Sequence, residues 1–342
     1  MTTARRLAAT ALFAALIPVT AALLVAAMVC TGPVSLVRRG HWRTARIGAF
    51  ALLYLVADVT GVLVATAHRL RRQDRSAARA DGCADPAAYA QLDRLLRLLY
   101  RAATRAFGLR LHITPPLPVP AAARTPGATG SGAPGPVLVL ARHAGPGDSF
   151  LVVHSLLAGA GLRPHIVLKR MLRLDPCLDI LLSRMPHCFV PAAHGARTER
   201  EMAALAARMG PGDALVLFPE GGNFTARRHR GAIGALRRTG RPERAARAAA
   251  MPHVLAPHTA GVLAVLRAAP TADVVFVAHT GLDWITSVRT GWAALPLRRR
   301  VEAHWWQVPA ARIPAGDEAR GDWLFAQWAR VDAWIAEHAD AA

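Results

Sequence analysis

Two long apolar runs dominate the first 80 residues of the chain. Residues 7–30 contain no charged side chain and are long enough to cross a hydrocarbon core of about 30 Å as a helix. Residues 47–67 are interrupted only by Asp58, and we expect this stretch to span the membrane, to enter it without crossing, or to pack on the first helix. A carboxylate at membrane depth is costly and often functional, but neutralisation or an arginine partner would explain it, so Asp58 receives no catalytic role.

Arginines surround both apolar runs. Arg5 and Arg6 resemble the start of a signal peptide, but the run that follows is longer than a typical signal core and lacks an A-x-A exit, which favours a retained helix. The two flanks together carry more arginines than the connecting loop, which favours a hairpin with both ends cytoplasmic. Residues 1–80 are thus predicted to anchor the chain in the cytoplasmic or inner membrane, with the remaining domain in the cytoplasm.

The next two segments differ sharply in pattern. Residues 86–109, within a segment 81–113, place leucines and aromatic residues at helical spacing with arginines between them, which predicts an amphipathic helix. This helix is expected either to pack in the core or to lie along the membrane or under an acyl chain. Residues 114–136 are rich in proline, glycine and other small residues, which predicts a linker or a surface loop.

From residue 137 onward, short apolar runs alternate with helical patterns. Strands are predicted at "VLVLA", "PHIVL", "ALVLF", "HVLAP" and "VVFVA". We therefore expect an α/β domain over residues 137–342, with a largely parallel or mixed central sheet flanked by helices and preceded by the N-terminal transmembrane helical hairpin. Trp323, Trp328 and Trp334 indicate a last helix packed back on this domain, and Trp305 and Trp306 are expected in its core or at an interface.

Composition strengthens the membrane interpretation. Hydrophobic residues make up 53% of the chain, the mean hydropathy is +0.25 and the formal net charge is +20. Lys169 is the single lysine, so nearly all the positive charge comes from arginine, and alanine is abundant as well. This pattern is as typical of GC-rich codon usage as of a basic patch, so no nucleic acid partner is expected. The positive charge still favours binding to anionic lipid headgroups at a bilayer surface. The four cysteines have no zinc-ligand or C-x-x-C spacing, so we expect free thiols and no metal site.

Candidate chemistry follows two of the predicted strands. His143 ends "VLVLARH", and Asp148 follows a turn, where it serves either as a helix-capping acid or as the partner of His143 in a catalytic dyad. A second turn, Pro219 to Gly222, follows "ALVLF" and is glycine-rich enough for backbone amides to approach an anion. Ligands of open α/β sheets gather at the carboxyl ends of strands, so both turns are expected to face one pocket.

These motifs resemble the glycerolipid acyltransferases typified by 1-acylglycerol-3-phosphate acyltransferase. His143 and Asp148 match the family's His-x-x-x-x-Asp motif, and "FPEGG" at 218–222 is similar to its Phe-Pro-Glu-Gly block. Between them, "LKRMLRLDPCLDILLSRMPHCFV" resembles the Lys-x-x-Leu-x-x-x-Pro segment and the strand after it, while "MPHVLAPHTAG" and "ADVVFVAHTG" resemble the later blocks. The resemblance covers residues 137–338 with the blocks in the family's order.

The resemblance implies transfer of a fatty acyl group from an acyl-CoA or acyl carrier protein thioester to a lysophospholipid hydroxyl, with no other cofactor. His143 would act as general base, Asp148 would orient it, and amides of the Gly145 to Gly147 turn would stabilise the oxyanion. Glu220 and Gly221, with Gly222, would shape the acceptor site, Glu220 by ordering the turn or pairing with an arginine. The bilayer is the expected partner, and 1-acylglycerol-3-phosphate giving phosphatidate the favoured reaction.

The chain departs from the family at its arginines. The family block continues with Thr-Arg, whereas Gly222 and Asn223 stand here, so Arg227 and Arg228 are the candidates to grip phosphate. Arg197 is the candidate for the arginine expected after the second block's strand, with Arg184 ahead of it. Another lysolipid or lipid alcohol therefore remains an alternative acceptor. An alternative function for the chain is that of a non-catalytic basic membrane protein that binds anionic lipid or nucleic acid. Arg142 stands where many relatives have Asn.

Overall fold

A computed structural model describes residues 2–37, 41–73, 85–117, 135–145, 147–190, 195–285 and 287–338. The chain divides into two units. The first contains Met1–Arg110, Leu168–Phe189 and Gly291–Arg298, and the second contains Leu111–Val167, Val190–Thr290 and Arg299–Ala342.

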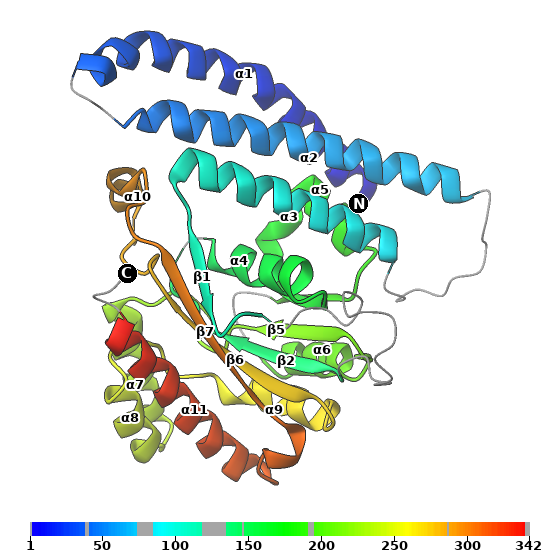
Figure 1. The fold of residues 1–342 in the computed structure, drawn as a ribbon. Coiled ribbons are helices and arrows are strands. Elements are labelled where there is room, and N and C mark those ends of the chain that lie inside the picture. Colours follow the sequence, from blue (N-terminus) through cyan, green and yellow to red (C-terminus); the bar gives the residue numbers. More distant parts are fainter. Residues whose placement is uncertain are drawn as a thin grey trace, which may run out of the picture. The chain divides into compact units, whose positions relative to one another are not determined.

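The first unit begins with two long helices, α1 (Thr2–Val37) and α2 (Arg43–Gln73). Both are long and apolar enough to cross a membrane, and they pack against each other, as Figure 1 shows. Gly48 permits a close approach, since a Cβ there would lie 2.9 Å from Leu24. Large apolar side chains such as Leu7, Leu23 and Leu63 remain exposed, which is typical of lipid contact. The pair is consistent with the predicted transmembrane hairpin.

Asp58 is buried inside the first unit. Its Oδ1 accepts a hydrogen bond from the backbone N–H of Cys177, 3.1 Å away, in the short helix α5 (Pro176–Leu182). One turn later, the carbonyl of Gly61 accepts from Gln91 of α3 (Pro86–Phe107) at 2.6 Å. Of the explanations considered for Asp58, an arginine partner is not the one that the structure shows: its partners are the Cys177 amide and the Asp175 side chain, which are brought to it because α5 packs on α2.

The predicted amphipathic helix is α3. The Asp85 side chain caps its start by accepting from Ala87 N–H, and Gly108, with φ of 74°, ends it. Tyr89, Leu92 and Leu96 lie on the buried face, so this face packs in the unit's core.

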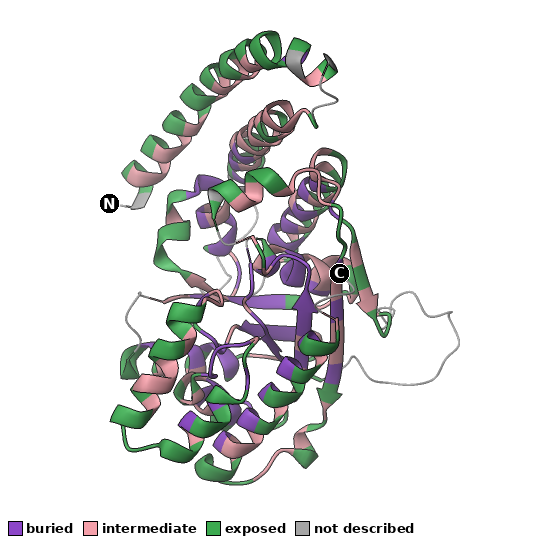
Figure 2. Cartoon of the chain, turned by 90° about the vertical axis from the view of Figure 1, so that its left-hand side faces the viewer, coloured by how far each residue is buried: buried purple, intermediate pink, exposed green. Residues whose placement is uncertain are grey.

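The sheet has seven strands in the order β1-β7-β6-β2-β5-β3-β4. Strand β2 pairs in parallel with β5 and β6, β3 with β5, and β1 with β7, whereas β6 and β7 are antiparallel. The sheet is therefore mixed, as predicted, and β2 and β5 are buried at every position (Figure 2). The strands are β1 (Leu111–Thr114), β2 (Val137–Ala141), β3 (Arg163–Lys169), β4 (His187–Val190), β5 (Asp213–Leu217), β6 (Asp273–Thr280) and β7 (Val301–Val308).

The strand predicted at "HVLAP", residues 253–257, does not form. The segment is buried, with Val254 fully inaccessible, but its backbone donors are taken by side chains. His253 N–H donates to Asp332 and Leu255 N–H to Glu220, so no neighbouring strand is needed to satisfy them. Most of the predicted loop at 114–136 lies outside the described residues; Thr114 itself ends β1.

Helices surround the sheet. The last helix, α11, packs on β6 and buries Leu324 and Trp328, which confirms the predicted C-terminal helix. Phe276 of β6 stacks on Trp306 with ring centroids 5.4 Å apart, so Trp306 is a core residue, while Trp305 is only half-buried. The remaining helices are α4 (Asp148–His154), α6 (Ala196–Ala206), α7 (Ala226–Arg238), α8 (Pro242–Ala249), α9 (Thr259–Ala268), α10 (Val288–Ala294) and α11 (Asp317–His338), with shorter helical turns at Ser155–Gly159, Arg170–Leu174 and Ala310–Arg312.

Candidate active site

Three parallel strands end at one edge of the sheet. β2 lies between β5 and β6, with Val139 opposite Val216 on one side and Val275 on the other. Arg142 N–H donates to Val277 O at 3.1 Å, which extends the ladder by one residue. The next residue, His143, therefore leaves the sheet at the edge where β5 leads to the 218–222 turn, as expected from the two motifs.

The turn after His143 is shaped by glycines. A Cβ at Gly145 would lie 2.5 Å from the carbonyl oxygen of Leu282, so a larger residue has no room. Gly147 has φ of 87° and is the N-cap of α4, whose first residue is Asp148. α4 packs Val152 against Val139 and Val216, and this contact fixes the helix against the sheet.

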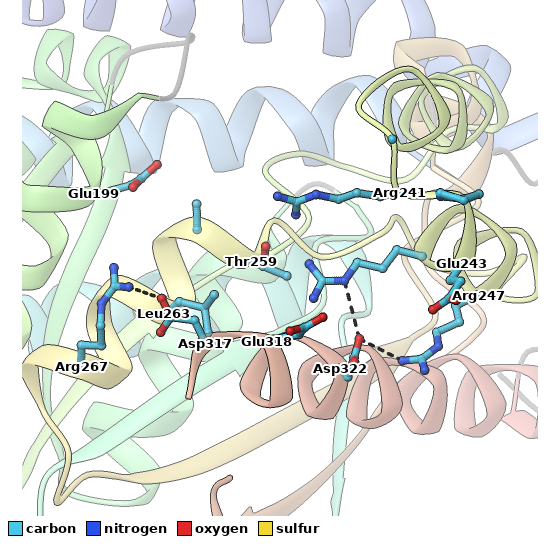
Figure 3. Close-up of a pocket in the computed structure, with 14 residues that line it drawn as sticks. Glu199, Arg241, Glu243, Arg247, Thr259, Leu263, Arg267, Asp317, Glu318 and Asp322 are labelled. Carbon is cyan, nitrogen blue, oxygen red and sulfur yellow. Dashed lines mark hydrogen bonds and ion pairs between the residues drawn. The ribbon is translucent and has the colours of Figure 1, made fainter. Parts of the chain in front are cut away.

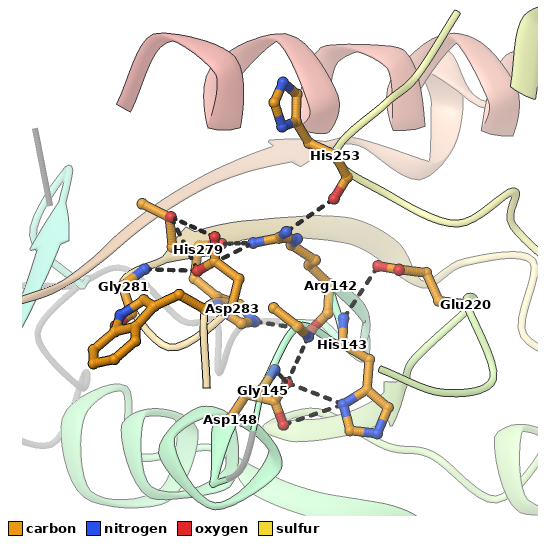
Figure 4. A network of polar contacts seen from close by, with 12 residues as sticks. Arg142, His143, Gly145, Asp148, Glu220, His253, His279, Gly281 and Asp283 are labelled. Atoms are coloured by element: carbon orange, nitrogen blue, oxygen red, sulfur yellow. Dashed lines mark hydrogen bonds and ion pairs between the residues drawn. The ribbon is translucent and has the colours of Figure 1, made fainter. Parts of the chain in front are cut away.

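His143 and Asp148 meet directly. Nδ1 of His143 lies 2.9 Å from Oδ2 of Asp148 and 3.2 Å from Oδ1 (Figure 4). Because a carboxylate only accepts, Nδ1 carries the proton and Nε2 is left with its lone pair. Asp148 is 2% exposed and His143 is 15% exposed, so the histidine is the member of the pair that solvent or a substrate reaches.

The surroundings of Asp148 favour its charged form. Burial opposes ionisation, but the hydrogen bond from His143, the electrostatic effect of the nearby His279 and His143 imidazoles, and the Gly145 amide outweigh it and lower the pKa of Asp148. Amides of Ala144 and Ser149 also donate to it, at 2.8 and 2.7 Å. The pair thus has the geometry of a base held by a buried carboxylate.

The same bonds correct one expectation. Amides of the Gly145 to Gly147 turn were expected to stabilise an oxyanion, but the Gly145 amide donates to Asp148 Oδ2 at 3.1 Å, and the Ala144 amide donates to the same oxygen at 2.8 Å. Both donors are therefore engaged in holding the aspartate.

Glu220 joins the second turn to His143. Its Oε1 accepts from the backbone N–H of His143 at 3.1 Å, and its Oε2 accepts from Leu255 N–H at 3.0 Å. Burial raises the pKa of Glu220 to about 8, against the Leu255 and His143 hydrogen bonds and the charge of Arg142. Both oxygens face backbone amides, so its contacts are those of a residue that orders the turn, one of the two roles expected for it.

Two phenylalanines that flank the second turn, Phe218 and Phe224, also hold His143 in place. The Phe218 ring lies 4.9 Å from the imidazole, centroid to centroid, and the Phe224 N–H donates to the His143 carbonyl at 3.1 Å. The backbone of His143 is thus held on both its N–H and its C=O by residues 220–224. Displacing that turn would move the histidine.

Arg142 is buried and ties three segments together. Its guanidinium donates to the carbonyls of His279 and His253, at 2.7 and 2.8 Å, and Asp283 lies 3.7 Å away. His279 Nε2 in turn lies 2.9 Å from the carbonyl of Arg142 (Figure 4). Burial lowers the pKa of His279, although Asp148 and Asp283 oppose the shift, so this imidazole is a neutral donor to that carbonyl.

The sequence analysis did not assign roles to these supporting residues. His279 ends β6, which is parallel to β2, so its place beside Asp148 follows from the sheet topology. Arg142 was noted only as a departure from the family pattern. The feature that could have predicted its role is its position directly after a fully buried strand, because a charged side chain at such a position needs buried partners.

The predicted arginines lie in different surroundings. Arg228, at the start of α7, donates from Nη1 to the carbonyl of Asn223 at 3.0 Å, and this nitrogen lies 2.8 Å from where a Cβ of Gly222 would be. Arg227 is exposed on the same helix. Arg197 is 84% exposed and pairs with Glu201 on its own helix, α6. Gly221 is exposed with φ of 67°, and Gly222 is buried. The structure thus brings Arg228 to the 218–222 turn and pairs Arg197 within α6.

Among the described residues, no three histidine, cysteine or acidic side chains group in a way that would hold a metal ion. Comparison with known protein families places part of the chain. Residues 124–280 match the model of the Acyltransferase family, and the matched stretch contains His143, Asp148 and the 218–222 turn. No curated protein and no solved structure matches the chain. The match supports acyl transfer by a domain like those of the glycerolipid acyltransferases.

Gly145→Ala should reduce stability because the new Cβ would meet the Leu282 carbonyl at 2.5 Å. We expect a loss of about 1–3 kcal/mol in the free energy of unfolding, measured by urea titration. Gly231→Ala is the control, since nothing lies within 4 Å of its Cβ position and alanine favours the helix. An equal effect at both positions would contradict the crowding at Gly145.

Glu220 predicts a pH dependence of stability. Its ordinary pKa is 4.5 and its folded pKa about 8, so between these values the folded protein holds a proton that the unfolded chain has lost. The free energy of unfolding should therefore fall as pH rises through this window. Glu220→Gln cannot ionise, so urea titrations at pH 5 and pH 8 should show a smaller fall than in the wild type. Identical falls would mean that Glu220 titrates normally.

Proposed function

We propose that the chain is a membrane-bound O-acyltransferase that moves a fatty acyl group from an acyl-CoA or acyl carrier protein thioester to the hydroxyl of a lysophospholipid, with 1-acylglycerol-3-phosphate giving phosphatidate as the favoured reaction. The observation that carries the proposal is the His143 imidazole, whose Nδ1 is held 2.9 Å from a buried carboxylate while the ring remains partly accessible. The Acyltransferase match over residues 124–280 supports the reaction class.

The proposed step is direct transfer. An alcohol is a weak nucleophile at neutral pH, so Nε2 of His143 takes the hydroxyl proton as the oxygen attacks the thioester carbonyl carbon. The tetrahedral intermediate collapses, the C–S bond breaks, and the thiolate leaves with the proton returned by the imidazolium. Asp148 stabilises that imidazolium and keeps Nδ1 protonated throughout. The reaction needs no acyl-enzyme.

The acceptor's phosphate is proposed to bind at the 218–222 turn. The family's arginine after this turn is missing, but the guanidinium of Arg228 folds back over Gly222 from α7. A guanidinium presents paired donors that suit a phosphate. Gly222 allows this because any side chain there would meet Arg228 Nη1.

His143→Ala should abolish thioester-dependent acylation of lysophospholipid, with a loss of at least about 10³-fold in rate, and Asp148→Asn should lower it by about 10²- to 10⁴-fold. The assay follows labelled acyl-CoA into lipid with protein in detergent or vesicles. His112→Ala, an exposed histidine of β1, is the matched control. A wild-type rate in His143→Ala would refute the mechanism, and retained vesicle binding by an inactive wild type would favour the non-catalytic alternative.

Arg228→Ala and Gly222→Ala should have the same effect, since the first removes the guanidinium and the second displaces it. We expect KM for lysophosphatidate to rise about tenfold while activity on an uncharged acceptor changes little. Arg312→Ala, an exposed arginine elsewhere in the unit, should change neither value. If lysophosphatidate use survives both site variants, Arg228 does not bind the phosphate.

A further inference from the structure

One stretch of the second unit concentrates positive charge without any compensating acid. Residues 221–242 contain six arginines and no aspartate or glutamate. They include all of α7, which carries five of these arginines. The overall arginine content of the chain does not explain this segregation, because acidic residues are interspersed on either side of it.

The arginines of α7 are available to a partner. α7 has no fully buried residue, and Arg227, Arg230, Arg237 and Arg238 are all exposed. No arginine of α7 forms an ion pair with any residue that the structure describes. The positive potential of this helix is therefore not neutralised within the unit.

The neighbouring cavity provides a contrast. A cavity of about 700 Å³ is lined by residues of α6, α8, α9 and α11 and by none of α7 (Figure 3). Three of the four arginines that line it are matched with acids: Arg244 and Arg247 both pair with Asp322, and Arg267 pairs with Asp317. The fourth, Arg241, belongs to the same acid-free stretch as α7, so the unmatched charge lies on α7 and on the residue that follows it closely in the chain.

α7 also begins at the candidate active site. Phe224 N–H donates to the His143 carbonyl, and Thr225 then caps α7 by accepting from Arg228 N–H at 3.2 Å. The 13 residues of α7 extend about 20 Å from that point. A partner lying along α7 is thus held beside the catalytic histidine.

The character of this surface favours a soluble acidic protein over a bilayer. None of the large exposed apolar side chains lies in α7; they occur in α1, α2 and α3, in the Arg170–Leu174 turn, and at Trp284 and Trp292. Insertion into a membrane interface needs such apolar anchors as well as charge. Arginines distributed along an exposed helix also suit an extended acidic face better than a single small nucleotide, which needs converging groups.

We propose that α7 is the docking surface for an acidic carrier protein that presents the fatty acyl group as a thioester on a flexible arm. The inference rests on the proposed acyl transfer and assigns the donor of that reaction. Charge complementarity raises the encounter rate and orients the carrier, so the arm reaches His143 from the start of α7. Apart from Arg228, which is assigned to the acceptor phosphate, the arginines of α7 take no part in the proposed transfer.

The test compares two donors that carry the same acyl chain, acyl carrier protein and CoA, using the full-length protein. Arg230→Glu combined with Arg237→Glu and Arg238→Glu should lower kcat/KM for the carrier by tenfold or more, mainly through KM, while kcat/KM for acyl-CoA stays within about twofold. Added salt should weaken carrier use in the wild type more than in the variant. The matched control reverses exposed arginines of α6 and of the Ala310–Arg312 turn, with Arg200→Glu and Arg312→Glu, and should retain the wild-type preference.

The outcomes separate this inference from the proposed function. Transfer from acyl-CoA with no use of the carrier, or equal losses with both donors, would overturn the docking surface and leave acyl transfer standing. Loss of binding to anionic vesicles in the triple variant, with carrier use intact, would assign α7 to lipid instead. Failure of the wild type with every donor would overturn the proposed function itself. Neutral substitutions of the same arginines to Gln should give a smaller carrier-specific loss.

Discussion

The buried carboxylate of Asp148 is the interaction on which the site depends. A charge that is 2% exposed is tolerated only if its oxygens are satisfied, and here one imidazole and three backbone amides converge on it. Those donors come from both ends of the loop that joins β2 to α4. The loop therefore wraps around the carboxylate. Because the carboxylate accepts a hydrogen bond from Nδ1 of His143, this arrangement also fixes the tautomer of the histidine.

A second carboxylate supports the first from the next strand. Glu220 binds the amide of His143, and Arg142 binds carbonyls at the end of β6 and in the 253–257 segment. Residues from three parallel strands thus share one buried polar network at their carboxyl ends. This arrangement places a pKa-lowered aspartate and a pKa-raised glutamate on either side of one histidine. The two acids differ because the donors around Asp148 outweigh burial, whereas those around Glu220 do not.

Sequence patterns predicted the parts of this structure that depend on local periodicity. The strands β2, β5 and β6, the helix α3 and the two apolar helices all follow from spacing. The local pattern left Asp148 open between a helix cap and a partner of His143, and the pairing was implied by the resemblance to the His-x-x-x-x-Asp motif. The 253–257 segment was mispredicted because its apolar residues are buried without a strand partner, which depends on Asp332 and Glu220 reaching it from distant positions. The engagement of the Gly145 amide and the placement of Arg228 over Gly222 likewise depend on three-dimensional contacts that no periodicity encodes.

The buried carboxylate in α2 determines which way that helix is turned. Asp58, Gly61, Val62 and Ala65 form one stripe that faces α3 and α5, while Val56, Leu63 and Val64 lie exposed on other sides of the helix. Rotating α2 about its axis would take Asp58 away from its partners and place it on the apolar side of the helix, and the cost of that exchange opposes rotation. The apolar surface of α2 therefore has a defined direction, which is set by a polar residue on the opposite side of the helix.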